Sequence, residues 1–228
     1  MRRHLFDARE DLANSLARRV SETLNKGLEA RGAASLAISG GSTPGRFLDA
    51  LSKERIDWTK VGITLVDERF VPPSSDRSNE RLARERLLHN EARLARFVPL
   101  YSAAATAEEA ARAAEAGIAL LPKPFDAVIL GMGTDGHTAS FFPDAGNLAE
   151  LLDRDGRRLV LAVDAPSAGE PRLTLTLPLL VEARFLALHI EGGKKREALD
   201  AALADGGPET PIRAVADAAP RLELYWAP

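Results

Sequence analysis

One histidine of the sequence stands where a catalytic group is expected, in a glycine-rich loop directly after an apolar run. His137 ends the segment GMGTDGH, which follows the apolar residues FDAVIL. Of the other three histidines, His4 lies near the N-terminus and His89 among charged residues, while His189 falls inside the apolar run FLALHI, where we expect a satisfied structural role. An imidazole titrates near neutrality, and the glycines leave its ring accessible, so His137 suits the role of a general base.

A second loop has the composition of a phosphate-binding site. Gly40, Gly41, Ser42 and Thr43 follow the apolar run SLAIS, and Pro44 is well placed to open a helix. Glycines let backbone N–H groups approach an anion, and the hydroxyls and the helix N-terminus add further donors. The loop lacks the GxxxxGK[ST] spacing of a Walker A motif. On its own it fits a plain strand-to-helix turn as well as a phosphate cradle.

Three charged residues follow another apolar run. Asp67, Glu68 and Arg69 come directly after VGITLV, and charges at the end of a buried strand are costly unless they are solvated, paired or used. A carboxylate beside a guanidinium suits sugar hydroxyls and a developing negative charge. A structural ion pair at the mouth of a loop fits the same residues equally well.

Two further cationic positions adjoin apolar runs. Arg172 opens the run RLTLTL, and the pair Lys194–Lys195 follows two glycines at the end of FLALHI. Each cation alone is typical of a solvated surface. Together with the glycine-rich loop 40–43 they would supply the hydroxyls, backbone donors and positive charge that a phosphate group needs.

Cofactor chemistry finds little support in the sequence. Residues 131–136 match GxGxxG, a dinucleotide-binding motif when an uninterrupted helix follows directly, but Pro143 and Gly146 break the segment that follows. Nicotinamide-nucleotide binding, with Asp164 as the ribose-binding acid, therefore remains a minor alternative. No two histidines have metal-ligand spacing with a carboxylate, and cysteine is absent, so we expect no metal and no other cofactor.

The elements that must position these loops alternate between short apolar runs and amphipathic segments. The patterns predict helices at 7–31, 79–90, 106–121 and 194–203, one more after Pro44, and strands at 35–39, 61–66, 97–100, 125–131, 158–163, 172–177, 185–190 and 222–226. Asp7 is expected to cap the first helix, and Gly32 to end it. This alternation predicts an α/β fold, a largely parallel sheet flanked by helices on both faces in a Rossmann-like single domain over residues 1–228. Ligands of such folds gather at the carboxyl ends of the strands, where these loops lie.

Composition narrows the partners and the location. The 228 residues carry a net charge of -3 with scattered cations, which argues against nucleic acid and anionic lipid as partners. No run of about 18 apolar residues could span a bilayer, and the N-terminus turns acidic before a signal-type apolar core can form, so we expect a cytoplasmic protein. The expected partner is a small molecule, and the chain is a monomer or a small homo-oligomer.

Five segments together resemble the 6-phosphogluconolactonases, relatives of glucosamine-6-phosphate deaminase with a fold similar to ribose-5-phosphate isomerase. They are SGGSTPGRF, VDERFVPPSSDRSN, GMGTDGHTASFFP, PRLTLTLP and GGKKREAL, in that family's order over nearly the whole chain. The resemblance implies hydrolysis of a phosphorylated sugar lactone in the pentose phosphate pathway. It departs from the family pattern at Asp144, where glycine is usual, and at the end YWAP, which lacks the usual terminal helix.

The resemblance also implies roles for individual residues. The phosphate site would comprise Gly40, Gly41, Ser42 and Thr43 with Arg172 and Lys195; Arg69 and Asn79 would line the sugar pocket, and His137 would activate water. For the reaction itself we expect Asp135 or a neighbouring backbone group to orient the His137 ring, and Arg69 to stabilise the developing negative charge. Asp67 matches the proton-shuttling acid of the deaminases, and its role here stays open. A deaminase or isomerase acting on amino-sugar phosphates is the alternative enzyme, although HTASFFP lacks the glutamate of the deaminase pattern HIAFNEP. A non-catalytic sugar-phosphate sensor is the alternative from another class.

Overall fold

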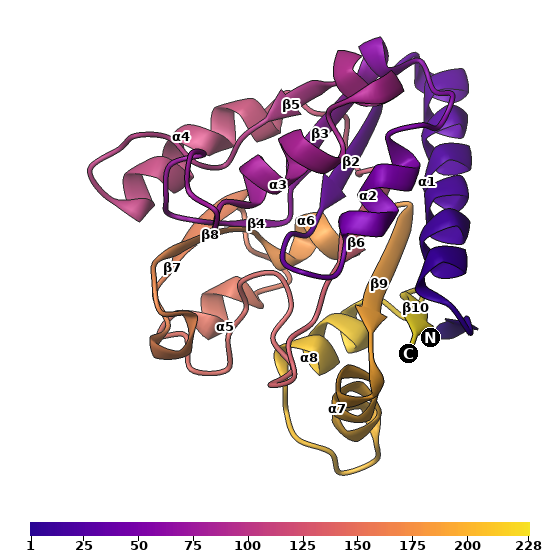
Figure 1. Cartoon of the computed structure of the whole chain (residues 1–228). Coiled ribbons are helices and arrows are strands. Elements are labelled where there is room, and N and C mark those ends of the chain that lie inside the picture. Colours follow the sequence, from indigo (N-terminus) through magenta and orange to yellow (C-terminus); the bar gives the residue numbers. More distant parts are fainter.

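A computed structural model describes all 228 residues and contains two sheets (Figure 1). The larger sheet has seven strands, all parallel, in the order β1 (Arg2–Leu5), β10 (Glu223–Ala227), β9 (Phe185–Glu191), β6 (Ala127–Leu130), β2 (Ala34–Ile38), β3 (Val61–Leu65) and β5 (Arg96–Val98). The smaller sheet is antiparallel, in the order β4 (Asp67–Arg69), β8 (Arg172–Leu175) and β7 (Val160–Val163). The expected α/β fold with a mostly parallel sheet is confirmed.

Eight α-helices surround the sheets. They are α1 (Arg9–Arg31), α2 (Gly45–Leu51), α3 (Asn79–Arg86), α4 (Ala107–Ala119), α5 (Leu148–Leu151), α6 (Leu177–Val181), α7 (Gly193–Leu203) and α8 (Pro211–Ala218). Short 3₁₀ helices lie at Trp58–Lys60, Asn90–Leu94 and Pro166–Ala168. Figure 1 shows α1 running along the sheet with α2 beside it, and the two termini close together. None of the helices is both long and apolar enough to cross a membrane.

The first helix shows how the apolar pattern builds the core. Leu12, Leu16, Val20 and Leu24 recur every four residues and are all fully buried. Gly32 ends the helix in the left-handed region at φ +73°, as expected of a residue without a side chain. The expected cap at Asp7 is wrong, because the helix begins at Arg9 behind Ala8 and no side chain caps it.

The four central strands of the large sheet position the site. β9, β6, β2 and β3 are consecutive neighbours and parallel, so their carboxyl ends meet at one edge of the sheet. The residues of β2 and β3 are buried throughout, as their continuous apolar runs require of strands covered on both faces. The loops that follow the four strands carry the glycines, charges and histidine singled out in the sequence. The expectation that these loops converge is therefore confirmed.

Several elements differ from the predicted ones. The strand that includes Arg172 pairs antiparallel with β4 in the small sheet rather than joining the parallel sheet. The strands β1 and β4 and the helices α5, α6 and α8 have no counterpart among the predicted elements. For β1 the reason is that RRHL is mostly polar and exposed at the sheet edge. One continuous core of 64 buried residues includes side chains of both sheets. This shared core supports the prediction of a single domain.

Candidate active site

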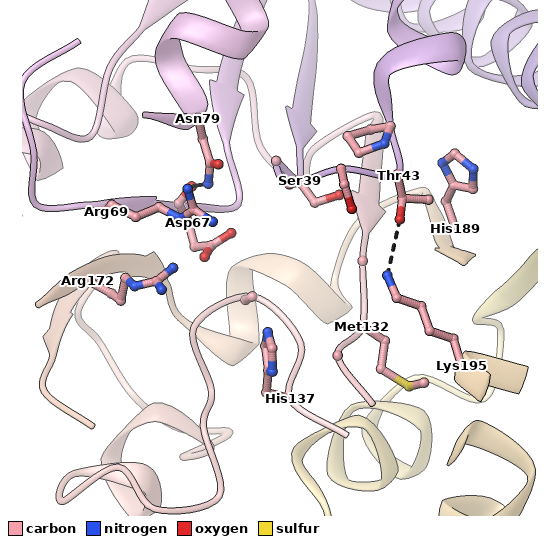
Figure 2. Close-up of a pocket in the computed structure, with 17 residues that line it drawn as sticks. Ser39, Thr43, Asp67, Arg69, Asn79, Met132, His137, Arg172, His189 and Lys195 are labelled. Atoms are coloured by element: carbon pink, nitrogen blue, oxygen red, sulfur yellow. Dashed lines mark hydrogen bonds between the residues drawn. The ribbon is translucent and has the colours of Figure 1, made fainter. Parts of the chain in front are cut away.

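A polar cavity of about 190 Å³ opens at the carboxyl edge of the parallel sheet (Figure 2). All residues expected at the site line it except Asp135: Gly40, Gly41, Ser42, Thr43, Asp67, Arg69, Asn79, His137, Arg172 and Lys195. The cavity also contacts Ser39, Met132 and His189, which the sequence did not single out for the site. The structure thus brings together side chains from the loops that follow four parallel strands and from the small sheet.

The glycine-rich loop after β2 approaches other parts of the chain too closely for larger residues. A Cβ atom at Gly40 would stand 1.9 Å from the Asn79 side-chain oxygen, and Gly41 has φ +85°. Pro44 is the N-cap of α2, so the helix opens where expected. The loop can therefore hold its hydroxyls and backbone donors only because both positions are glycines.

A lysine from α7 reaches this loop. Lys195 Nζ donates to Thr43 Oγ1 at 3.1 Å, and Lys195 is half-buried, whereas the neighbouring Lys194 is exposed. Burial lowers the pKa of Lys195, and the nearby Glu191 opposes this effect. An ammonium group that is partly stripped of water interacts strongly with a bound anion, which favours an anion site at Thr43 and Lys195.

A fully buried carboxylate holds the charged loop in place. Glu68 accepts the backbone N–H groups of Arg69, Asn79 and Glu80, each at 2.7 Å, and the hydroxyl of Ser78 at 2.9 Å. Burial raises the pKa of Glu68, and these four hydrogen bonds oppose the rise. Glu68 thereby ties β4 to the start of α3 and places Arg69 and Asn79 at the cavity. The sequence pattern gave no sign of this role, because it depends on residues eleven and twelve positions away.

Asp67 and Asn79 are also positioned by hydrogen bonds. Ser140 Oγ donates to Asp67 Oδ2 at 2.6 Å, and Asn79 Nδ2 donates to the backbone oxygen of Asp67 at 2.9 Å. The hydrogen bond from Ser140 engages one carboxylate oxygen of Asp67, and the residue, although only 8% exposed, still lines the cavity. Both side chains are presented to the cavity in a defined orientation.

Two arginines bring unpaired donors to the same side of the cavity. Arg69 and Arg172 are register partners on β4 and β8, and the Nε atoms of both are buried without a hydrogen-bond partner. Burial lowers the pKa of Arg172, but a guanidinium stays charged at any physiological pH. Arg172 lies over the ring of Phe142 at 5.5 Å. Unpaired buried donors of this kind favour an anionic or oxyanionic partner.

The histidine loop forms a local pair. His137 Nδ1 lies 2.7 Å from Asp135 Oδ1, which also accepts the backbone N–H of His137 at 3.2 Å. The His137 ring stacks on Phe142, with the ring centroids 4.5 Å apart. With Nδ1 engaged by a carboxylate, Nε2 is left as the basic nitrogen of the ring. No helix opens directly after Gly136, since α5 begins only at Leu148, so the loop lacks the helix N-terminus that a dinucleotide site requires.

Figure 2 shows that the cavity has two ends. Arg69, Arg172 and Asp67 lie on one side, and Thr43 and Lys195 lie across the cavity from them. The pairing of β8 with β4 sets Arg172 beside Arg69, while Lys195 lines the same cavity, and the expected grouping of Arg172 with Lys195 stays a prediction.

The expectation for His189 also needs correction. Its side chain is buried as expected, but it lines the cavity and its Nε2 makes no hydrogen bond. Glu191 Oε1 lies 3.4 Å from this Nε2, so the ring has a charged neighbour but no hydrogen bond within the protein. The apolar residues around it in the sequence concealed this, because alternate side chains of a strand point to opposite faces.

Fold and site together define an α/β protein with a polar pocket for an anionic small molecule. Residues 7–226 match the family described as glucosamine-6-phosphate isomerases/6-phosphogluconolactonase, and the chain belongs to that family.

Similar proteins are named more narrowly. The chain is 58% identical to a 6-phosphogluconolactonase of Mesorhizobium japonicum, covering 98% of this chain and 94% of that protein. It is 54% identical to a 6-phosphogluconolactonase of Rhizobium meliloti, covering 99% and 98%. A crystal structure of a 6-phosphogluconolactonase from Shewanella baltica superposes with a TM-score of 0.95 at 39% identity, covering 100% of this chain and 98% of that one. A monomeric glucosamine-6-phosphate deaminase shares the fold, with a TM-score of 0.80 at 18% identity.

Proposed function

We propose that this protein hydrolyses 6-phosphogluconolactone to 6-phosphogluconate in the pentose phosphate pathway, the activity for which its full-length relatives are named. One observation carries the assignment to this pocket. His137, which pairs with Asp135, lines the same cavity as Thr43 and Lys195, so a base and an anion site lie within one small-molecule pocket. A phosphorylated lactone needs both, because its ester carbon and its phosphate lie at opposite ends of the molecule.

In this proposal His137 activates water. Its Nε2 takes a proton as the water oxygen bonds to the lactone carbonyl carbon, and the carbonyl oxygen becomes an oxyanion. The bond between that carbon and the ring oxygen then breaks, and the ring oxygen takes the proton back from His137 to become a hydroxyl. The carbonyl carbon is left as a carboxylic acid, which loses its remaining proton to solvent and becomes the carboxylate. Asp135 holds the ring through Nδ1 and stabilises the imidazolium that forms transiently. No covalent intermediate is needed.

The two arginines and the phosphate end of the pocket have separate roles in this proposal. Arg69 and Arg172 have buried, unpaired Nε donors on the side of Asp67, and we assign them to the oxyanion and the product carboxylate. Thr43, Lys195 and the glycine-rich loop hold the phosphate. Binding there fixes the distant carbonyl near His137, which converts binding energy into orientation.

Asp67 and Asn79 complete the pocket as groups for the sugar. The Asn79 side chain is fixed by the Asp67 backbone, and Ser140 engages one carboxylate oxygen of Asp67. The remaining carboxylate oxygen and the amide oxygen are acceptors, and we propose that they bind sugar hydroxyls. The cytoplasmic location, the single domain and the monomeric or small oligomeric state stay predictions.

The direct test follows the lactone itself. 6-Phosphogluconolactone is generated in place by a glucose-6-phosphate dehydrogenase, and its disappearance is timed with and without the protein, with and without a chelator. We expect acceleration over the spontaneous rate that survives the chelator. His137→Ala should lower kcat on the order of 10²- to 10⁴-fold with little change in KM. Full turnover by that variant would remove His137 as the base.

The alternatives predict other readouts. A deaminase would release ammonia from glucosamine-6-phosphate, and a sensor would bind a sugar phosphate without turning it over. No acceleration of lactone loss by the wild-type protein would refute the lactonase proposal and direct attention to those two assays.

A further inference from the structure

A buried histidine lies at the phosphate end of the pocket with an unpaired nitrogen. His189 in β9 is 2% exposed and lines the cavity with Thr43 and Lys195. Figure 2 shows its ring on the Thr43 side of the pocket, across from the arginines. Its Nε2 faces Glu191 Oε1 at 3.4 Å without a hydrogen bond, so Nδ1, which no group of the protein binds, is the ring nitrogen left for a ligand.

The neighbouring carboxylate favours a charged ring. Glu191, two residues along the same strand, places Oε1 3.4 Å from His189 Nε2, and this oxygen also lacks a hydrogen-bond partner. Burial acts to raise the pKa of Glu191, but His189 and the cations Arg9 and Arg46 outweigh it and lower that pKa. Glu191 is therefore ionised at neutral pH, and an ionised carboxylate beside an imidazole stabilises the imidazolium.

The other charged groups around His189 are mostly cations that pair with Glu191 or line the cavity. Lys195 approaches from α7, while Arg9 from α1 and Arg46 from α2 lie 3.3 Å and 3.9 Å from the second oxygen of Glu191. Phe47 of α2 meets the ring edge-on at 6.1 Å between centroids. Tyr225, the register partner on β10, stays neutral because burial raises its pKa to about 12. The cations at this end exceed the single carboxylate, so a bound phosphate would complete the charge balance.

We propose that His189 is a further substrate-binding residue, an imidazolium that donates its Nε2–H to Glu191 and its Nδ1–H to the phosphate held by Thr43 and Lys195. An imidazolium has a donor on each side of the ring, so both partners can be served at once. The inference rests on the proposed function in taking a phosphorylated substrate as the ligand. Glu191 is the positioning residue, because its Oε1 faces Nε2 and leaves Nδ1 for the phosphate.

Two substrates separate phosphate recognition from packing. His189→Gln should raise KM for 6-phosphogluconolactone on the order of ten- to a hundredfold and leave kcat within about threefold, because one charge-assisted hydrogen bond is lost. The unphosphorylated glucono-δ-lactone should be hydrolysed by this variant with the kcat/KM of the wild type. The control His89→Gln removes an exposed histidine that does not line the cavity and should change neither value. A KM within twofold of wild type, or equal losses on both lactones, would overturn the proposal.

A spectroscopic measurement on the wild-type protein tests the inference without any turnover. Inorganic phosphate is added while the four histidine rings are followed by NMR over a range of pH. We expect the ring signals of His189 to shift on phosphate binding, with those of His4 and His89 unchanged. If phosphate binds and the His189 ring does not respond, the proposal is refuted even where lactonase activity is intact. If the lactone is not hydrolysed but the ring responds, the phosphate role stands and the proposed reaction fails.

Discussion

The exchange of Lys195 for alanine tests the phosphate end of the pocket most sharply. Lys195 is half-buried and contacts Thr43 at 3.1 Å, whereas Lys194 carries the same charge in the same turn of α7 but is exposed. A hydrogen bond to a charged group contributes about 1.5–3 kcal/mol, and a unit charge pair at 4 Å near a protein surface contributes about 4 kcal/mol at most. A net loss of about 2–3 kcal/mol corresponds to a rise in KM of roughly 30- to 150-fold.

Lys195→Ala should keep or slightly gain folding stability while it loses affinity for the phosphate. Burial lowers the pKa of Lys195, which means that the folded protein disfavours its charged form. Stability is therefore lost below the ordinary lysine pKa, where the unfolded chain binds the proton more readily, and Lys195→Ala removes that cost. We expect the variant to unfold in urea at the same or a slightly higher concentration than the wild type. The loss of affinity then cannot be ascribed to unfolding.

The assay is the coupled lactone assay, supported by calorimetric binding of 6-phosphogluconate. Lys194→Ala should keep KM within about twofold of wild type, and Lys195→Arg should restore part of the affinity, since it keeps the charge but not the shape. The reasoning is refuted if Lys195→Ala binds the phosphorylated ligand as the wild type does. It is equally refuted if the two alanine variants lose affinity to the same extent, because a general effect of net charge would then suffice.

Three further outcomes follow from the geometry. Asp135→Asn should lower kcat on the order of tenfold or more at unchanged KM. Its unfolding in urea should shift little, because the side chains of His137 and Asp135 are 31% and 45% exposed. An unchanged kcat would refute the orienting role of Asp135. Gly133→Ala should also lower kcat, since its Cβ would stand 2.3 Å from the His137 ring, whereas Gly146→Ala meets nothing within 4 Å and should be active; equal activities would contradict this. Burial raises the pKa of Tyr225 to about 12, whereas an unfolded tyrosine titrates near pH 10. The contribution of Tyr225 to stability is therefore fully present below pH 10 and is lost as pH rises through 12, by about 3 kcal/mol relative to Tyr225→Phe. Unfolding of both proteins at several pH values can check this.

The strands of the main sheet could be predicted because each is marked by a continuous apolar run in the local sequence. The apolar runs at 35–39, 61–66, 125–131 and 185–190 each became a parallel strand within a few residues of the expected bounds. A strand covered on both faces requires such a run whatever its neighbours are. The placement of polar loops at their carboxyl ends followed from the same pattern.

The pairing of the small sheet and the N-terminal strand escaped prediction for the opposite reason. The run 172–177 reads as one more apolar strand, and only its pairing with β4 makes it antiparallel and sets Arg172 opposite Arg69. The mostly polar residues 2–5 form an edge strand through pairing with β10, more than 200 residues away. Neither choice of partner leaves a trace in local periodicity.

The sequence by itself determined the kinds of groups in the pocket and the short-range contact between His137 and Asp135. His137 and Asp135 are two residues apart, and the glycines around them allow the turn that joins them, so their pairing is a local matter. Tertiary structure alone decided that Lys195 reaches Thr43 across 152 positions, that Ser140 reaches Asp67 across 73, and that His189 faces the cavity. The physical reason is that such distances depend on which strands lie side by side, and many distant apolar segments compete for that choice.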